Sequence, residues 1–282
     1  MKSSLLIKIT AILMVAVTMF TLASCSLFEG LIDDGSTTEP SAVVTLSPRP
    51  SDTVETVEYL NKVLNNIKAS MPGVSVTREN KIRSVETGDN DEVEALINIT
   101  SAFAKSKQLK EIEDKRDFGS DLNDFLPLVG TSVVSRLTAD DVAEATIKTR
   151  GATEENPEPT DNNRFYYDIN VVINDSDKLG PVAKAFDLNI NKEDVLAQFQ
   201  DYTDTIEVSD YDVNYTECSI YAVVNKETDQ VIELSYTLNA VVTTTVNFLG
   251  SLEHLGETEI SFNYQQNADY EDFVWELPEI IE

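Results

Sequence analysis

The fold of this chain is decided by the stretch VIELSYTLNAVVTTTVNF at residues 231–248. Apolar and polar residues alternate along it, which is the period of a half-buried β-strand. One face carries Ile232, Leu234, Tyr236, Leu238, Ala240, Val242, Val246 and Phe248. A straight strand of this length would measure roughly 60 Å, which is too long for a compact domain. We therefore expect the strand to bend or coil within a curved sheet.

Other segments repeat this period of two. Residues 164–174, 218–224 and 259–264 alternate in the same way, and residues 273–277 form a last short apolar repeat. The polar turn at residues 225–230 leads directly into the long strand. Strands in this order predict an antiparallel meander with one dry face and one wet face.

The first folded element is predicted as a helix over residues 53–70. Asp52 is placed to cap it, with Glu55 as the return partner of a capping box, and Pro72-Gly73 ends it. Its apolar face carries Val57, Leu60, Leu64 and Ile67. This spacing is typical of a helix that packs one face against a core.

Four further elements complete the predicted order. Residues 91–109 and 181–200 are expected as helices, the second in two pieces. Residues 74–85 are expected as a strand, and residues 118–128 as a short, partly helical connector that ends near Pro127. A strongly curved sheet has a dry concave face that apolar groups must fill. We therefore predict an α+β fold, a curved antiparallel half-barrel meander with helices packed on its concave face.

The amino terminus has the order of a bacterial lipoprotein signal. A basic start is followed by an apolar run from Ile9 to Leu22, which has signal-peptide length and is too short for a comfortable membrane span. The run ends in Leu22-Ala23-Ser24-Cys25, which resembles the lipobox. We predict cleavage between Ser24 and Cys25 and lipid attachment at Cys25. The alternative is an ordinary secretory signal with a chance cysteine.

These boundaries predict three parts. Residues 1–24 form the removed signal peptide, residues 25–52 the lipidated cysteine and a flexible tether rich in Pro, Ser and Thr, and residues 53–282 a single α+β domain. Lipid would be the only anchor, so we place the protein at the extracytoplasmic face of a membrane in the bacterial cell envelope. By resemblance to other lipoproteins, the anchor is expected to be a diacylglyceryl thioether.

Charge and motif content narrow the function. The net charge of −29 should repel nucleic acid and anionic headgroups. His254 is the only histidine, and Cys218 lies on an apolar strand face, where a buried and inert thiol is expected. The sequence has no nucleophile elbow, phosphate-binding loop or dinucleotide fingerprint. We expect no enzyme activity, no cofactor and no metal site, and we interpret the acid clusters as solvated loop charge.

The order of parts in the second half resembles a known superfamily. Leu137-Thr138-Ala139-Asp140-Asp141-Val142 runs into a strand, and a Tyr-rich strand, a helix and two long strands joined by Asn225-Lys226-Glu227-Thr228 follow. This pattern is similar to the LolA/LolB and LppX/LprG superfamily of acylated lipoproteins. The resemblance implies a half-barrel whose cavity, between sheet and helices, carries lipids or lipoproteins.

A candidate ligand cavity follows from the apolar strand faces. Its expected lining is Phe165, Tyr167, Tyr236, Leu238, Phe248, Phe262 and Tyr264. The same residues could equally be plain core against the helices. Two functions stay open: a lipid-anchored module that binds an amphiphile, and a structural or protein-interaction lipoprotein with a filled core. A hydrolase that uses paired carboxylates is the weakest alternative, because such a pair is invisible in sequence.

Overall fold

The computed structural model describes residues 49–88, 91–93, 112–153, 155–177, 180–187 and 206–276. The predicted signal peptide, Cys25 and most of the tether lie outside these residues. So do most of the helix expected at 91–109 and the second piece of the helix expected at 181–200. These predictions stay predictions.

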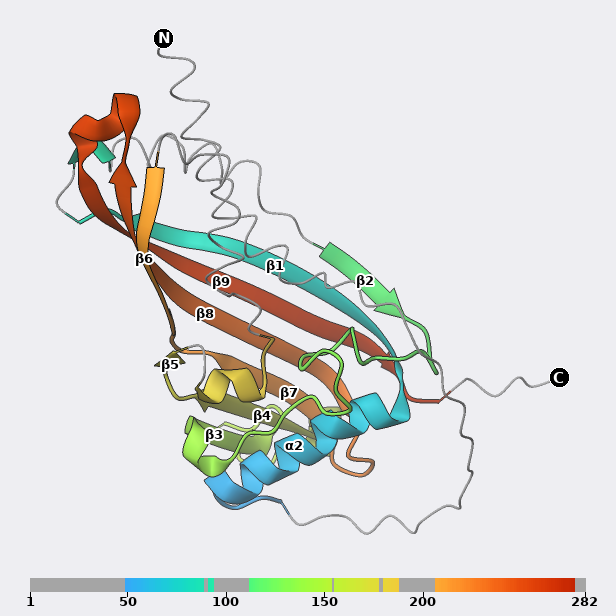
Figure 1. Ribbon diagram of the computed structural model, residues 1–282. Helices are drawn as coiled ribbons and strands as arrows, with labels where there is room; N and C mark the ends of the chain where they lie inside the picture. The colour runs from blue at the N-terminus through green and yellow to red at the C-terminus, as the bar shows by residue number, and fades with distance from the viewer. Residues whose placement is uncertain are drawn as a thin grey trace.

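The described strands form one nine-stranded antiparallel sheet in the order β2-β1-β9-β8-β7-β4-β3, with β6 beside β8 and β5 beside β6. Figure 1 shows the long strands β1, β8 and β9 side by side, with α2 across one end of the sheet. In chain order the elements are α2 (Thr53–Ser70), β1 (Gly73–Glu86), β2 (Ile112–Arg116), η1 (Ala139–Asp141), β3 (Val142–Thr149), η2 (Asn162–Phe165), β4 (Tyr166–Ile173), β5 (Ser176–Asp177), η3 (Pro181–Lys184), β6 (Ile206–Tyr215), β7 (Ser219–Asn225), β8 (Val231–Phe248), η5 (Gly250–Leu255) and β9 (Glu257–Val274).

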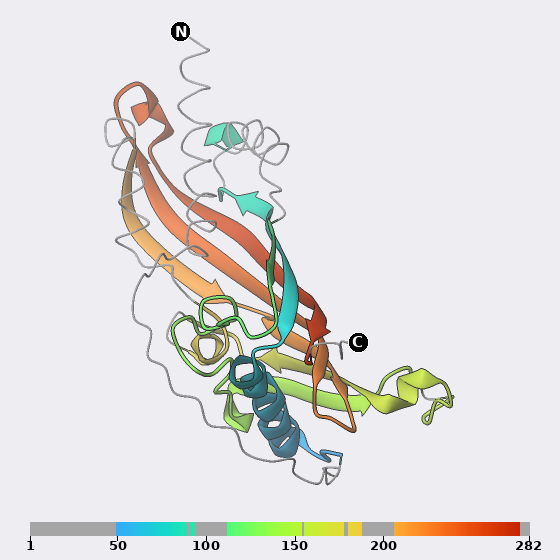
Figure 2. The same ribbon diagram turned by 90° about the vertical axis from the view of Figure 1, so that its right-hand side faces the viewer.

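The long strand β8 has the predicted limits, and it bends as its length requires. It pairs with β9 along most of one edge. On its other edge it pairs first with β7 and then, beyond Thr237, with β6. Figures 1 and 2 show the bend of the long strands, and α2 packs against β3, β4 and β8. The predicted class, a curved antiparallel sheet with helix packed on its concave face, is confirmed.

The alternation in β8 is confirmed from Leu234 to Phe248, where every second residue is buried. The prediction is wrong at the start of the strand, because Val231 is buried and Ile232 is only partly so. A bulge explains the difference: Val223 pairs with Glu233, whereas the next residue, Val224, pairs with Val231. An extra residue in one strand shifts the side-chain alternation by one position.

The last strand differs from its prediction in length. The sequence predicts two short strands separated by a polar gap, but β9 is one continuous strand of 18 residues. Within the gap between them, residues 265–270 pair with β1 on one side and with β8 on the other. Because both neighbours supply ladder hydrogen bonds, the segment stays extended without an apolar repeat of its own.

Helix α2 has the predicted limits. The Asp52 carboxylate accepts a hydrogen bond from the Glu55 N–H at 2.9 Å, as a helix N-cap does. The return bond differs from the expected capping box, because the Glu55 carboxylate accepts from the N–H and hydroxyl of Ser51 rather than from Asp52. The helix ends at Ser70, and the C-cap residue Met71 adopts the left-handed conformation before Pro72.

The other predicted elements are confirmed in outline. The strand expected at 74–85 is β1, and the first piece of the helix expected at 181–200 is the short 3₁₀-helix η3. Within the expected connector at 118–128, the Leu126 N–H donates to the Leu122 carbonyl, which makes one helical turn. The rest of that connector consists of turns and bends.

The segment that leads into β3 is fixed by a buried carboxylate. Asp141 accepts hydrogen bonds from the N–H and hydroxyl of Thr138, at 2.7 and 2.6 Å, and from the Lys184 ammonium at 2.6 Å. Burial alone would raise the pKa of Asp141, but the bonds from Lys184 and Thr138 outweigh it and lower the pKa. The ion pair ties η1 to η3, which are far apart in the sequence.

We expect Asp141→Asn to lower the free energy of unfolding at neutral pH by about 1–3 kcal/mol. A carboxyl with a lowered folded-state pKa stabilises the fold above its unfolded pKa of about 3.9, and that contribution is lost as the pH falls through the folded value. Urea melts between neutral and acidic pH should therefore show a shallower acid-induced loss in the variant. Asp140→Asn is the matched control. Equal acid limbs in wild type and Asp141→Asn would contradict the assignment.

Candidate functional site

The concave face of the sheet, the face on which α2 packs, is the candidate site. Of the residues predicted to line a cavity, Tyr236, Leu238 and Phe248 of β8 and Tyr264 of β9 lie buried on this face. Directly paired residues of neighbouring strands face the same side, so Tyr215 of β6 and Tyr264 flank Ala240 in one row. The sheet therefore brings Tyr236, Leu238 and Tyr264 close together, whereas Phe248 lies at the far end of β8, where it pairs with Ile206.

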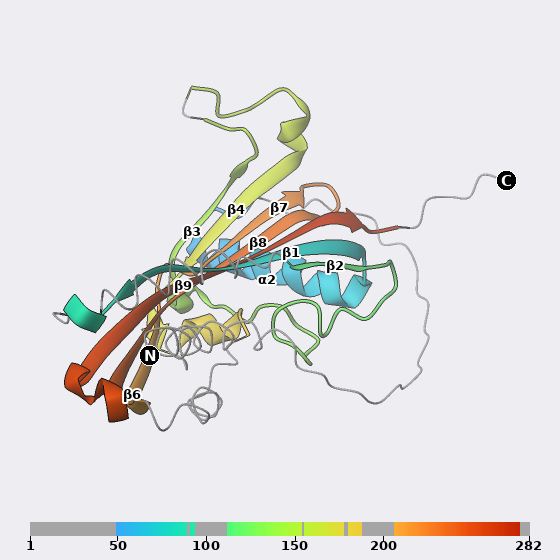
Figure 3. The same cartoon turned by 90° about the horizontal axis from the view of Figure 1, so that it is seen from above.

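Two other predicted lining residues lie at the far end of the same sheet. The Tyr167 ring packs edge-on against Tyr59 of α2, with 6.3 Å between ring centroids. Phe165 lies in η2 on the long β3–β4 hairpin, which projects from the sheet in Figure 3, and its ring stacks under Arg164. The backbone of Phe262 pairs with β1 and β8, but its side chain lies outside the described residues.

Four further aromatic residues of this face carry no signal in the sequence pattern that would place them there. Tyr236 meets Phe186 edge-on at 5.3 Å and Tyr270 at 6.1 Å, and Tyr270 meets Phe125 at 5.9 Å. Tyr215 is the fourth. Tyr270 lies within the polar gap that hid the continuation of β9, and Phe125 and Phe186 lie in segments without any strand pattern. Only contacts between distant segments assemble the group.

Within the part of the chain that the structure describes, two tyrosine hydroxyls on this face are buried without a hydrogen-bond partner. They belong to Tyr215, which is 0% exposed, and to Tyr236, which is 3% exposed. By contrast, the Tyr270 hydroxyl donates to the Phe125 carbonyl at 3.2 Å. Burial raises the pKa of Tyr215 and Tyr236 well above the usual value, so both hydroxyls keep their protons and can donate. A buried hydroxyl without a partner costs about 1–3 kcal/mol.

Charged groups lie at one edge of the tyrosine cluster, by which we mean Tyr215, Tyr236, Tyr264 and Tyr270. Arg78 of β1 donates to the Phe125 carbonyl at 2.8 Å, and its guanidinium lies 5.5 Å from the centre of the Phe125 ring. Asp187 accepts from the Val129 N–H at 2.9 Å. Burial raises the pKa of Asp187, although the Val129 N–H and Lys68 both favour its charged form. The candidate site is thus apolar, with a few polar groups at one end.

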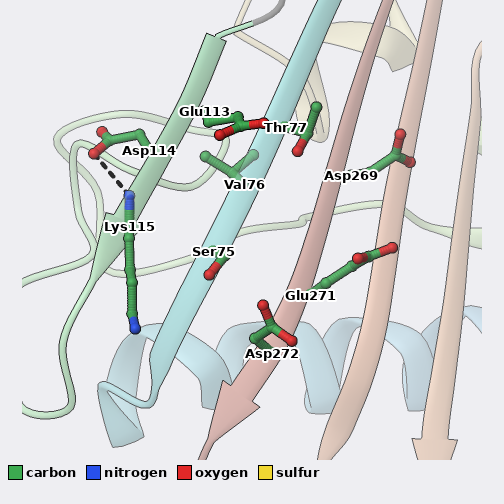
Figure 4. Close-up of a pocket in the computed structure, with 9 residues that line it drawn as sticks. All are labelled: Ser75, Val76, Thr77, Glu113, Asp114, Lys115, Asp269, Glu271 and Asp272. Carbon is green, nitrogen blue, oxygen red and sulfur yellow. Dashed lines mark hydrogen bonds between the residues drawn. The ribbon is translucent and has the colours of Figure 1, made fainter.

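The convex side carries a groove of about 550 Å³ with a different character (Figure 4). Its lining is Ser75, Val76 and Thr77 of β1, Glu113, Asp114 and Lys115 of β2, and Asp269, Glu271 and Asp272 of β9. The Asp114 carboxylate accepts from the Lys115 N–H. No group of acidic, His or Cys residues within the described ranges is arranged to hold a metal ion. We therefore interpret the groove as solvated acidic surface.

The two residues singled out for reactivity have unreactive surroundings. Cys218 is buried, and burial raises the pKa of its thiol to about 11. A thiol protonated at neutral pH is a poor nucleophile. His254 is exposed in η5, with its Nε2 atom 4.0 Å from Glu92.

Comparison with known proteins identifies no relative. No protein family, no curated protein and no solved structure matches this chain. The resemblance to the LolA/LolB and LppX/LprG superfamily therefore stays a prediction from sequence pattern. In the part of the chain that the structure describes, no helix is both long enough and apolar enough to cross a membrane.

The two hydroxyls of the tyrosine pair Tyr236 and Tyr270 should respond differently to removal. Tyr236→Phe removes a buried hydroxyl without a partner, so in ligand-free protein it should leave the free energy of unfolding unchanged or raise it. Tyr270→Phe removes a hydrogen bond and should lower it by about 0.5–1.5 kcal/mol. Urea melts of delipidated protein measure both values. A larger loss for Tyr236→Phe would mean that its hydroxyl has a partner.

Proposed function

We propose that this chain is a lipid-anchored protein of the bacterial cell envelope that holds an amphiphile against the concave face of its sheet. The observation that carries the proposal is the pair of buried hydroxyls of Tyr215 and Tyr236, which find no hydrogen-bond partner among the described residues of a mostly apolar face. Buried polar groups in folded proteins nearly always have a partner, from protein, water or ligand. An amphiphile offers oxygen acceptors to the hydroxyls and an apolar body to the residues around them.

The spacing of the face suits an extended apolar ligand. Tyr236, Leu238 and Ala240 follow one another on the concave side of β8, with roughly 7 Å between successive members. The small Ala240 lies between two tyrosines of neighbouring strands, Tyr215 and Tyr264. Ligand sites are typically apolar surfaces with a few polar groups that fix orientation. An acyl chain along β8 with its acceptor atoms near the two hydroxyls matches that description.

The second candidate function, a structural lipoprotein with a filled core, is favoured by the other end of the face. There α2 covers β3, β4 and β8 with a fully buried apolar side that includes Leu60, Leu64 and Ile67. A uniformly filled core gives no reason to bury two hydroxyls without partners. We therefore assign the filled core to the end of the concave face that α2 covers. We assign the ligand to the end that carries Tyr215 and Tyr236, which we call the tyrosine end.

Native mass spectrometry of the intact lipidated chain, purified in a mild detergent, tests the proposal. We expect a non-covalent adduct in addition to the covalent anchor. The double variant Tyr215→Phe, Tyr236→Phe should reduce adduct occupancy by about tenfold, because loss of two hydrogen bonds costs on the order of 1 kcal/mol or more. The matched control is Tyr221→Phe, since the Tyr221 hydroxyl bonds Asp168 instead. Wild-type protein without an adduct would favour the filled core.

The anchor is tested separately. Cys25→Ala should abolish incorporation of labelled fatty acid and leave residues 1–24 attached, because processing of a lipobox depends on lipid at the cysteine. Metabolic labelling and the intact mass of the chain measure the two effects. Cys218→Ala is the control and should be labelled and processed like wild type. Labelling that persists in Cys25→Ala would overturn the lipoprotein assignment.

A further inference from the structure

A long segment without regular secondary structure crosses from β2 to η1, and we call residues 117–138 the strap. Figures 1 and 2 show it beside α2, on the side of the sheet that α2 covers. Segments of this length inside a compact fold usually have a specific role. The strap carries Phe125, whose ring and carbonyl contact Tyr270 and Arg78 of the candidate site. The strap therefore covers the tyrosine end of the concave face, where Arg78 and Tyr270 lie.

Helix α2 holds the strap by its backbone. Asn61 donates to the Leu137 carbonyl at 2.7 Å, and Asn65 accepts from the Val134 and Ser135 N–H groups at 2.7 and 3.0 Å. Lys68 comes next on the same helix face, since the spacings of four and three residues keep side chains in line. These three side chains bind the main chain of the strap rather than its side chains.

The Lys68 contact is unusual. Its ammonium group lies within hydrogen-bonding distance of five backbone carbonyl oxygens, and the side chain is 7% exposed. The distances are 3.4 Å to Asn123, 3.0 Å to Pro127, 3.1 Å to Leu128, 3.0 Å to Thr131 and 3.2 Å to Val133. An ammonium has three protons, so five oxygens around it form a coordination shell rather than a set of separate hydrogen bonds.

The backbone is shaped to make this shell. Leu128 and Gly130 both have positive φ, 58° and 72°. The left-handed region is unfavourable for leucine, so surrounding contacts must hold it there. Carbonyl dipoles that converge on one point repel each other unless a cation lies between them, as in the carbonyl rings of ion sites.

We infer that the five carbonyl oxygens form a cation-binding ring that Lys68 fills from within the chain, and that this one positive charge keeps the strap closed over the tyrosine end of the concave face. The ring and its dependence on charge stand on the strap geometry alone. The consequence for ligand access rests on the proposed function.

The other charged groups around Lys68 fix the conditions of the test. Burial lowers the pKa of Lys68 to about 8, the carboxylates of Asp187, Asp121 and Asp124 act in the opposite direction, and Arg136 lowers it further. At about pH 6.5 the ammonium is charged in both the folded and the unfolded chain. Measurements at this pH therefore compare a charged ring with variants that have no charge, without a change in protonation.

Hydrogen exchange of the full chain at that pH tests the ring. In Lys68→Met, which keeps the length of the side chain and loses its charge, protection of the strap amides of Val129, Val134 and Ser135 should fall by at least about tenfold. Amides of β8 should keep their protection. The matched control is Lys62→Met on the same helix, because Lys62 is mostly exposed and pairs with Asp229. Unchanged strap protection in Lys68→Met would overturn the inference.

Chemical rescue separates the charge from the packing of the side chain. Lys68→Ala opens space in the ring, so methylammonium chloride should restore part of the strap protection. Tetramethylammonium chloride at the same ionic strength should not, because it has no N–H donor and does not fit. Equal rescue by the two salts would show a general salt effect and contradict a specific ring.

A measurement on the unsubstituted chain covers the case in which the variants unfold. Acetic anhydride labelling of folded protein should modify Lys68 at least about tenfold more slowly than Lys62, because reaction at Lys68 requires the strap to open. Equal rates would mean that the ring is open and the inference is wrong.

Ligand exchange tests the consequence for access. If the intact chain carries an amphiphile, Lys68→Met should take up a fluorescent fatty acid from vesicles faster than wild type and Lys62→Met. Equal uptake rates together with a loosened strap would separate the strap from the ligand site. Wild-type protein that takes up no fatty acid would count against the proposed function and leave the exchange result on the ring intact.

Discussion

The structure depends on one geometric constraint: a strand of 18 residues cannot stay straight inside a domain of this size. β8 has β9 on one edge and two successive partners, β7 and β6, on the other. The bend that this arrangement requires gives the sheet a concave side. Because every second residue of β8 from Leu234 onward is buried, that side is apolar and must be covered. The position of α2 and of the strap follows from this need.

The concave face is covered in two different ways. At one end α2 lays a mostly apolar side against the sheet, and the buried polar side chains that it carries, Thr56, Tyr59 and Lys68, are hydrogen-bonded. At the other end the face carries tyrosines, and two of their hydroxyls have no partner in the described ranges. Burial of unpaired hydroxyls is unfavourable in a filled core but useful in a site that must orient a ligand. This contrast within one sheet is the physical basis of the proposed function.

The strap shows how a segment without regular secondary structure can be fixed on such a face. Its main chain is bound by Asn61, Asn65 and Lys68 from one helix face and by Arg78 and Tyr270 from the sheet. Side chains from regular elements thus replace the ladder hydrogen bonds that the strap lacks. Lys68 alone contacts five carbonyl oxygens of the strap, so much of the attachment depends on this one residue. The position of the strap is therefore sensitive to the charge of a single side chain.

The elements whose signals are local can be predicted from the sequence alone. The limits of α2 follow from its cap at Asp52 and the stop at Pro72, and those of β8 from its alternation and the turn before it. The curved antiparallel class follows from that strand's length. Three features depend on a partner elsewhere in the fold: the bulge that buries Val231, the continuation of β9 through its polar gap, and the contacts of Tyr236 with Phe186 and Tyr270. Pairing across distant segments leaves no local period, so the sequence predicted part of the site but neither the tyrosine cluster nor the carbonyl ring around Lys68.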